Sequence, residues 1–130
     1  MSGLSKTIFQ AGVAAFSIGL AGNFSFASEV DVIDVVIAKS GNSERQYRFS
    51  VTLKHADSGW EHYADKWEVI GPDGEILGIR KLAHPHENEQ PFTRSLRGVK
   101  ISEDILEVTI RAHDSVHHYG GKEMVVRLTH

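Results

Sequence analysis

Residues 47–54 read Tyr-Arg-Phe-Ser-Val-Thr-Leu-Lys, and in this stretch polar residues separate the apolar ones. Such alternation is typical of a β-strand with one buried and one wet face, because successive side chains point to opposite sides of a sheet. The same period of two recurs in residues 106–113 and 124–128, and more briefly at Trp67 and Val69. From residue 30 onward the sequence therefore predicts β-structure.

The pattern divides into segments that we expect to be strands: 30–38, 46–55, 66–71, 75–82, 93–101, 105–113 and 122–128. The first changes phase near residues 35–36, and the fifth shifts phase around Gly98, which indicates a bulge. Short strands at this spacing, with Trp67 on the third, predict an all-β fold. We expect a seven-stranded antiparallel β-sandwich, immunoglobulin-like or fibronectin-III-like.

The N-terminal segment has the features of a secretory signal peptide. Lys6 precedes a mostly apolar run over residues 8–20, and Ser25-Phe26-Ala27 places small residues at both positions that a signal peptidase inspects. The apolar run is shorter than a bilayer span requires. We expect cleavage of residues 1–27, which leaves residues 28–130 as a single sandwich domain without a membrane span. The expected location is periplasmic or secreted.

Composition excludes some partners. The chain has 14 basic and 17 acidic residues, and loss of Lys6 with the signal peptide leaves 13 against 17, a net charge of −4 with histidines neutral. We expect no nucleic acid partner, because a phosphate-binding surface needs a basic patch. The sequence has no cysteine. We therefore expect a core that suffices without disulfides, and no lipid attachment through an N-terminal cysteine.

Seven of the eight histidines lie between His55 and His118. If successive strands run antiparallel, the connections alternate between two ends, and residues 56–65, 83–92 and 114–121 share one of them. We predict a histidine-lined surface there, because loops on a rigid scaffold are where sites are usually built. The candidate metal ligands are His55, His62, His84, His86, His113, His117 and His118.

The sharpest motif is His84-Pro85-His86. Proline biases the residue before it to an extended conformation, and in an extended segment residues two apart point the same way, about 6.6 Å apart along the chain. Both imidazoles could then reach one metal ion. The alternative is an exposed polar loop, since a short motif stays a hypothesis until its structural context is known.

The other histidines have competing roles. His113 and His117 would share one face if their connection makes a helical turn, and the alternative is a solvated turn. His55 continues the inward phase of residues 47–53, so it should lie at the rim of the core, where a hydrogen-bonded packing role competes with a ligand role. His62 lies among aromatic residues, and its role stays open.

Acidic residues in or beside the same connections supply oxygen ligands or acceptors for imidazole N–H groups. They are Asp57, Glu61, Asp65, Glu87, Glu89 and Asp114. Imidazole and carboxylate without thiolate suit Zn²⁺ or Cu²⁺ rather than Cu⁺. We expect a bound ion to be released as the imidazoles protonate, around or below their reference pKa of about 6.5.

Three classes of function follow. The leading hypothesis is an exported soluble binding protein that holds a transition metal, copper or zinc, through histidines in three loops at one end of the sandwich. The alternative is an immunoglobulin-like interaction module whose histidine and aromatic loops bind a periplasmic or extracellular protein without metal. A metalloenzyme has only the architecture in its favour, and no nucleophile elbow is present, so we expect a non-enzyme.

Overall fold

The computed structural model describes residues 29–40 and 45–128. Its strands are β2 (Asp31–Lys39), β3 (Gln46–Lys54), β4 (Ala64–Ile70), β5 (Ile76–Lys81), β6 (Phe92–Lys100), β7 (Glu107–Asp114) and β8 (Met124–Arg127). Each strand end lies within two residues of its expected place. The described ranges contain no helix, and so no apolar helix long enough to cross a membrane. The expected signal peptide, residues 1–27, lies outside the described residues.

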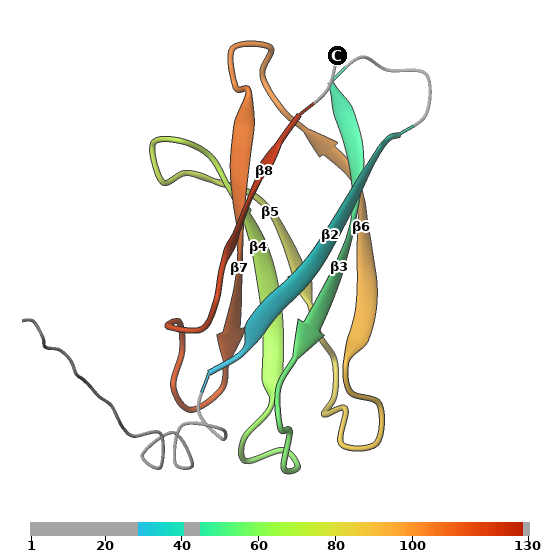
Figure 1. The fold of residues 1–130 in the computed structure, drawn as a ribbon, viewed down its shortest axis with the longest axis vertical. Coiled ribbons are helices and arrows are strands. Elements are labelled where there is room, and N and C mark those ends of the chain that lie inside the picture. The colour runs from blue at the N-terminus through green and yellow to red at the C-terminus, as the bar shows by residue number, and fades with distance from the viewer. Residues whose placement is uncertain (1–28, 41–44, 129–130) are drawn as a thin grey trace, which may run out of the picture.

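The strands form two antiparallel sheets (Figure 1). The smaller sheet has the order β2-β3-β6, and the larger has the order β5-β4-β7-β8. Every hydrogen-bonded pair of neighbouring strands is antiparallel. The expectation of an all-β fold with seven antiparallel strands is therefore confirmed.

The core lies between the two sheets. Tyr47, Phe49, Val51 and Leu53 of β3 are fully buried, as their alternation predicted, and Trp67 of β4 belongs to the same apolar cluster. Burial of one large apolar side chain stabilises a fold by about 1.5–3 kcal/mol. This shared core holds the two sheets together, so β3 and β4 present the residues at their ends in defined places.

The bulge expected at Gly98 is confirmed. In the β3–β6 pair, Tyr47 lies opposite Val99 while Phe49 lies opposite Leu96, so β6 carries one extra residue between them. Gly98 has a φ of 67°, a left-handed conformation that glycine adopts without a side-chain clash.

The phase change in β2 occurs earlier than expected. The register shifts between Val32 and Asp34, which leaves Ile33 41% exposed. The prediction of a phase change near residues 35–36 was therefore wrong. The N–H of Val32 donates to the carbonyl of Lys122, 2.8 Å away in the segment before β8. The N-terminal part of β2 thus bends toward the other sheet. The local sequence pattern does not predict this bend, because it depends on a contact with a distant residue.

The alternation over residues 106–113 predicts that Leu106 points inward with Val108 and Ile110, but the side chain of Leu106 points outward. It lies just before β7 and is 47% exposed, whereas Ile105 is buried in its place. The N–H of Ile105 donates to the carbonyl of Ser102 at 3.1 Å, which makes this segment a turn rather than the start of a strand. Alternation therefore holds only from Glu107 onward.

The connections alternate between the two ends of the sandwich. The β3–β4, β5–β6 and β7–β8 connections, which hold the histidines, lie together at the lower end in Figure 1. The expected gathering of these three connections at one end is confirmed. For example, the N–H of Ser115 in the β7–β8 connection donates to the carbonyl of Tyr63 in the β3–β4 connection at 2.9 Å.

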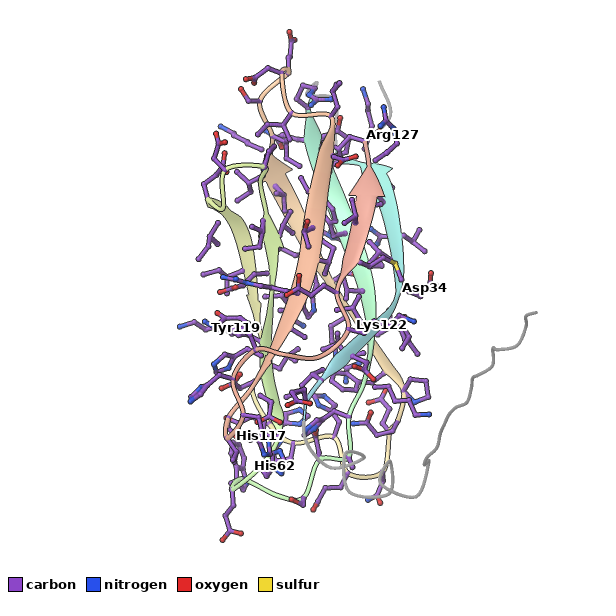
Figure 2. The ribbon with its side chains drawn as sticks, turned by 60° about the vertical axis from the view of Figure 1, so that its left-hand side comes forward. Asp34, His62, His117, Tyr119, Lys122 and Arg127 are labelled. Atoms are coloured by element: carbon purple, nitrogen blue, oxygen red, sulfur yellow. The ribbon has the colours of Figure 1, made fainter. Side chains whose placement is uncertain are left out.

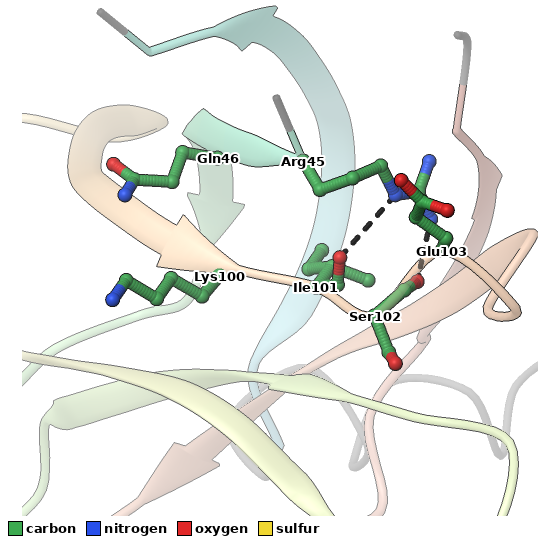
Figure 3. A pocket seen from close by; sticks show the side chains of 6 residues that line it. All are labelled: Arg45, Gln46, Lys100, Ile101, Ser102 and Glu103. Atoms are coloured by element: carbon green, nitrogen blue, oxygen red, sulfur yellow. Dashed lines mark hydrogen bonds between the residues drawn. The ribbon is translucent and has the colours of Figure 1, made fainter. Parts of the chain in front are cut away.

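The opposite end is held by one buried arginine (Figure 3). The guanidinium of Arg45 donates to the carbonyls of Ile101 (3.3 Å), Ser102 (2.7 Å) and Ile105 (2.5 Å), and to the hydroxyl of Tyr47 (2.8 Å). A depression of about 480 Å³ lies beside it. Arg45 has a φ of 64°, an unusual conformation for a residue with a side chain. These bonds join the start of β3 to the β6–β7 connection.

Candidate metal centre

One carboxylate stands at the centre of the histidine end. Asp114, the last residue of β7, is completely buried. Its Oδ2 lies 2.8 Å from His55 Nε2 and 2.7 Å from His62 Nε2. His117 Nδ1 lies 3.6 Å from the same oxygen. Residues from the β3–β4 and β7–β8 connections therefore converge on one atom.

The second oxygen of Asp114 organises the turn that follows β7. Oδ1 accepts the backbone N–H groups of Val116 and His117, each at 2.6 Å. This pairing places the His117 ring against His62, with ring centroids 4.9 Å apart, and Figure 2 shows the two side chains together at this end. One aspartate thus shapes the turn with one oxygen and meets the imidazoles with the other.

His55 is oriented from its far side by Asp57. The residue directly follows β3 and its side chain is fully buried, which confirms its place at the rim of the core. Its Nδ1 lies 2.5 Å from Asp57 Oδ1. A histidine that binds a metal usually gives its other ring N–H to a carboxylate, which fixes the tautomer. Asp57 and His55 have this arrangement, with Nε2 toward Asp114.

His62 is positioned by a tight turn. Its backbone N–H donates to the carbonyl of Gly59 at 3.2 Å, and its carbonyl accepts the N–H of Ser58 at 2.8 Å. Gly59 has a φ of 88°, which a residue with a side chain adopts only at a cost. The ring of His62 packs edge-on against His55 with centroids 4.8 Å apart.

Both buried aspartates are held ionised. Burial alone would raise the pKa of Asp57, but hydrogen bonds from His55 and from the backbone N–H groups of His86 and Ala64 bring that pKa below its ordinary value. Burial acts in the same way on Asp114, and the N–H groups of its turn together with His62 lower its pKa. Two negative charges therefore lie among imidazoles out of water, where they need compensation.

The donor atoms are spaced for a small cation. In a tetrahedral Zn²⁺ site with ligands about 2.0–2.1 Å from the ion, ligand atoms are about 3.3 Å apart. The ligand atoms of His55, His62 and Asp114 all lie within 4.8 Å of one another, and His117 Nδ1 is 3.2 Å from His62 Nε2. The His55, His62 and Asp114 group, called here the buried centre, could hold a metal ion with His117 as a fourth ligand.

The His84 and His86 pair lies beside the buried centre. The backbone N–H of His86 donates to Asp57 Oδ2 at 2.7 Å, while its buried ring stacks on Phe92 with centroids 3.9 Å apart. Among the residues that the structure describes, neither ring nitrogen of His86 has a hydrogen-bond partner. Burial, then the positive charge of Arg94, lowers the pKa of His86. His84 is exposed, and its ring lies 4.7 Å from that of His86, tilted by 37°.

His113 and His118 form a separate pair. His113 points to the outer face of the larger sheet, where its Nε2 lies 3.1 Å from His118 Nδ1 and its Nδ1 lies 2.6 Å from Asp65 Oδ1. His113 was expected to share a face with His117 if the connection were helical. The connection is instead a turn, and His117 meets His62.

Asp114 is the central residue that sequence reasoning undervalued. It was one of several acidic residues named as oxygen ligands or acceptors. A signal was present, because Asp114 continues the inward series of Val108, Ile110 and Ala112, just as His55 continues the inward series of β3. A polar residue in phase with a core face at a strand end predicts a buried polar contact.

Comparison with known proteins gives one informative likeness. No family model matches the chain, and no solved structure matches it. The chain is similar to a protein of Halomicrobium mukohataei described as "Putative lipoprotein", with 44% identity over 98 residues. The match covers 75% of this chain and 47% of that protein, so the chain spans about half the length of its relative.

Proposed function

We propose that this protein is an exported binding protein that holds one divalent transition metal ion at the buried centre, with zinc or copper preferred. One observation carries the proposal. Asp114 Oδ2, which is out of contact with solvent, faces the Nε2 atoms of both His55 and His62 at 2.7–2.8 Å. This is the ligand chemistry that Zn²⁺ and Cu²⁺ take in proteins.

Charge balance supports a divalent ion. Asp57 and Asp114 together bring two negative charges into a buried space. Without a metal, both ring nitrogens of His55 face carboxylate oxygens, and only the imidazolium form of a histidine donates from both nitrogens. A divalent ion replaces that proton and neutralises both carboxylates. Metal binding should therefore release a proton and weaken as the pH falls.

Export has support from two sides. The N-terminal segment predicts a secretory signal peptide, and the similar protein of Halomicrobium mukohataei is described as a lipoprotein. We propose a periplasmic or secreted location on these grounds.

The strand order also distinguishes between the two proposed types of sandwich. The fourth strand, β5, lies in the sheet β5-β4-β7-β8, as in the proposed fibronectin-III-like sandwich. In an immunoglobulin constant-type sandwich the fourth strand instead joins the sheet of the first two.

Holding or delivering the ion fits the donor set better than catalysis. With His117 as fourth ligand, the buried centre offers three imidazoles and one carboxylate. Catalytic zinc sites keep a position open for water or substrate, whereas closed four-ligand sites are structural. His117 is 39% exposed, so it is the ligand that can leave to admit or release the ion. We therefore propose a non-enzymatic role.

The test is elemental analysis followed by titration. Protein isolated from its native compartment without a histidine tag should contain stoichiometric zinc or copper. Apo-protein should bind one equivalent of Zn²⁺ in a competition titration, and His62→Ala should weaken this binding by about 10-fold or more. His84→Ala, which changes an exposed imidazole, is the matched control and should bind like wild type. Absence of binding at micromolar free Zn²⁺ and Cu²⁺ would overturn the proposal.

A second candidate function is recognition of a protein partner by the same end. Trp60 is 66% exposed and Val116 is 48% exposed, and both lie in the histidine connections. Large apolar side chains of this kind anchor protein interfaces. A partner captured equally well by metal-free protein and by the His62→Ala variant, but lost with Trp60→Ala, would favour this function over metal binding.

A further inference from the structure

We propose a second, more exposed metal site on the outer face of the larger sheet, formed by His113 Nε2 and His118 Nδ1 and taking Cu²⁺. The two nitrogens lie 3.1 Å apart, close to the ligand separation in a metal coordination shell. None of its ligands belongs to the buried centre. The site goes beyond the proposed function and stands or falls independently of it.

Asp65 prepares His113 to bind a cation. The Nδ1–H of His113 donates to Asp65 Oδ1 at 2.6 Å, which leaves the lone pair on Nε2. That is the tautomer a metal ligand needs, and the carboxylate also fixes the orientation of the ring. The side chain of His113 is only 16% exposed, so its orientation is fixed by its surroundings. Tyr119 packs edge-on against the ring, with centroids 4.8 Å apart.

The turn after β7 presents His118 to this nitrogen. The N–H of His118 donates to the Asp114 carbonyl at 3.0 Å, and the His118 carbonyl accepts the Asp114 N–H at 2.9 Å. His118 has a φ of 62°, a conformation that costs free energy in a residue with a side chain. Neighbouring residues thus point to opposite sides of the sheet. Asp114 and His117 lie at the buried centre, whereas His113 and His118 lie on the outer face.

The cations near this pair are already engaged. Glu68, which is buried beneath the outer face, pairs with Lys66 at 3.2 Å and with Arg111 at 2.8 Å. Tyr119 covers the group and donates its hydroxyl to Glu68. Lys66 and Arg111 bring two positive charges, which the carboxylates of Glu68 and Asp65 together balance. These four side chains therefore sum to zero charge and do not repel a cation between the two imidazoles.

Copper is the ion that the donor set favours. Two imidazole nitrogens in an exposed position leave the remaining coordination positions to water, which suits the tetragonal geometry of Cu²⁺. Among the divalent first-row metals, Cu²⁺ also has the highest affinity for a given nitrogen site. A site with only two protein ligands should bind more weakly than the buried centre and exchange its ion more readily.

The test is a Cu²⁺ titration of untagged protein followed by electron paramagnetic resonance. Wild type should take two equivalents, and the weaker should show coupling to two nitrogens. His118→Asn is the sharpest variant, because asparagine tolerates positive φ and keeps the turn. It should lose the weaker equivalent and keep the tighter one. Asp65→Asn should weaken the weaker equivalent about 10–100-fold, as loss of a carboxylate behind a ligand does.

A second ligand variant and a variant of the other site separate the outcomes. His113→Asn should repeat the result of His118→Asn, and His62→Ala should lose the tighter equivalent only. A single equivalent that disappears in His118→Asn but survives His62→Ala would support the outer site and overturn the buried centre. Two equivalents in both the folded His118→Asn and His113→Asn variants would overturn the outer site. Loss of the weaker equivalent in His84→Ala alone would also overturn it.

Discussion

The two ends of the sandwich both bury charged side chains, but they satisfy them differently. At one end, Arg45 gives its N–H groups to three backbone carbonyls and a tyrosine hydroxyl, so its donors have ordinary acceptors. At the other end, ring nitrogens face each other and share one carboxylate oxygen, as His62 does with His117 and Asp114. Donors that each meet an ordinary acceptor indicate a stabilising network, whereas several nitrogen and oxygen atoms that converge on one point, where an ion can replace a shared proton, indicate a ligand site.

The largest effect is expected for Asp114→Asn. This change removes the charge that His55 and His62 share, so metal binding should be lost, and the free energy of unfolding should fall by about 3–5 kcal/mol as for a broken buried ion pair. Chemical denaturation and metal titration measure the two effects. Asp34→Asn, which changes an exposed carboxylate on β2, is the control and should alter neither. If the Asp114→Asn variant folds and binds metal with unchanged affinity, Asp114 is not a metal ligand.

The next largest effect is expected at the opposite end. Arg45→Lys cannot reproduce the planar fork that reaches Ile101, Ser102 and Ile105. Carbonyls left without a donor should lower the free energy of unfolding by about 1–3 kcal/mol. Metal affinity, measured on the same samples, should stay within about twofold of wild type. A large loss of affinity would mean that the two ends are coupled, which would contradict the view that Arg45 stabilises the fold independently of the metal centre.

A smaller, pH-dependent effect is expected for His86→Phe. The pKa of His86 is lowered from 6.5 by burial, so below pH 6.5 the unfolded chain binds a proton that the folded protein does not. Wild type should therefore lose stability as the pH falls below 6.5, until the folded pKa is reached. Phenylalanine keeps the stack on Phe92 and has no proton to bind, so the variant should lose less over that window.

The titration of Asp57 and Asp114 at lower pH provides a control for the His86 experiment. The pKa values of Asp57 and Asp114 are lowered from 3.8, so the stability they contribute is present above pH 3.8 and is lost as the pH falls through their folded pKa values. Wild type and His86→Phe should share this acid transition. Thermal unfolding between pH 7 and pH 3 measures both windows. Identical curves for the two proteins above pH 4 would contradict the account of His86.

The smallest effect is expected for His84→Ala. His84 is exposed, and surface substitutions of this kind change stability by no more than about 0.5 kcal/mol. Binding of Zn²⁺ to the buried centre should be unchanged. If His84→Ala instead lost an equivalent of metal, the His84-Pro85-His86 motif would be a ligand pair, and the contrast would extend to a third group of residues.

The fold was largely predictable because its signals are local. The alternation of β3 and the glycine that marks the bulge in β6 are local features of the sequence. The antiparallel direction of successive strands then placed three connections at one end. The errors arose where distant contacts decide. The bend in β2 depends on the bond from Val32 to Lys122, ninety positions along the chain, and the inward turn of Ile105 depends on a loop that Arg45 binds.

The candidate site was predictable as a region but not as a set of ligands. His55 was placed at the rim of the core by its phase, yet that phase does not reveal that Asp57 and Asp114 face its two nitrogens. The split between His117 and His118 follows from a turn whose shape Asp114 Oδ1 determines. Such choices depend on side chains that meet only in three dimensions.

The most direct test of the buried centre is anomalous X-ray diffraction at the zinc absorption edge from crystals of protein loaded with one equivalent of Zn²⁺. The account predicts the strongest anomalous peak about 2.0–2.2 Å from His55 Nε2, His62 Nε2 and Asp114 Oδ2. A peak at any other group of residues, with none among these three side chains, would contradict it.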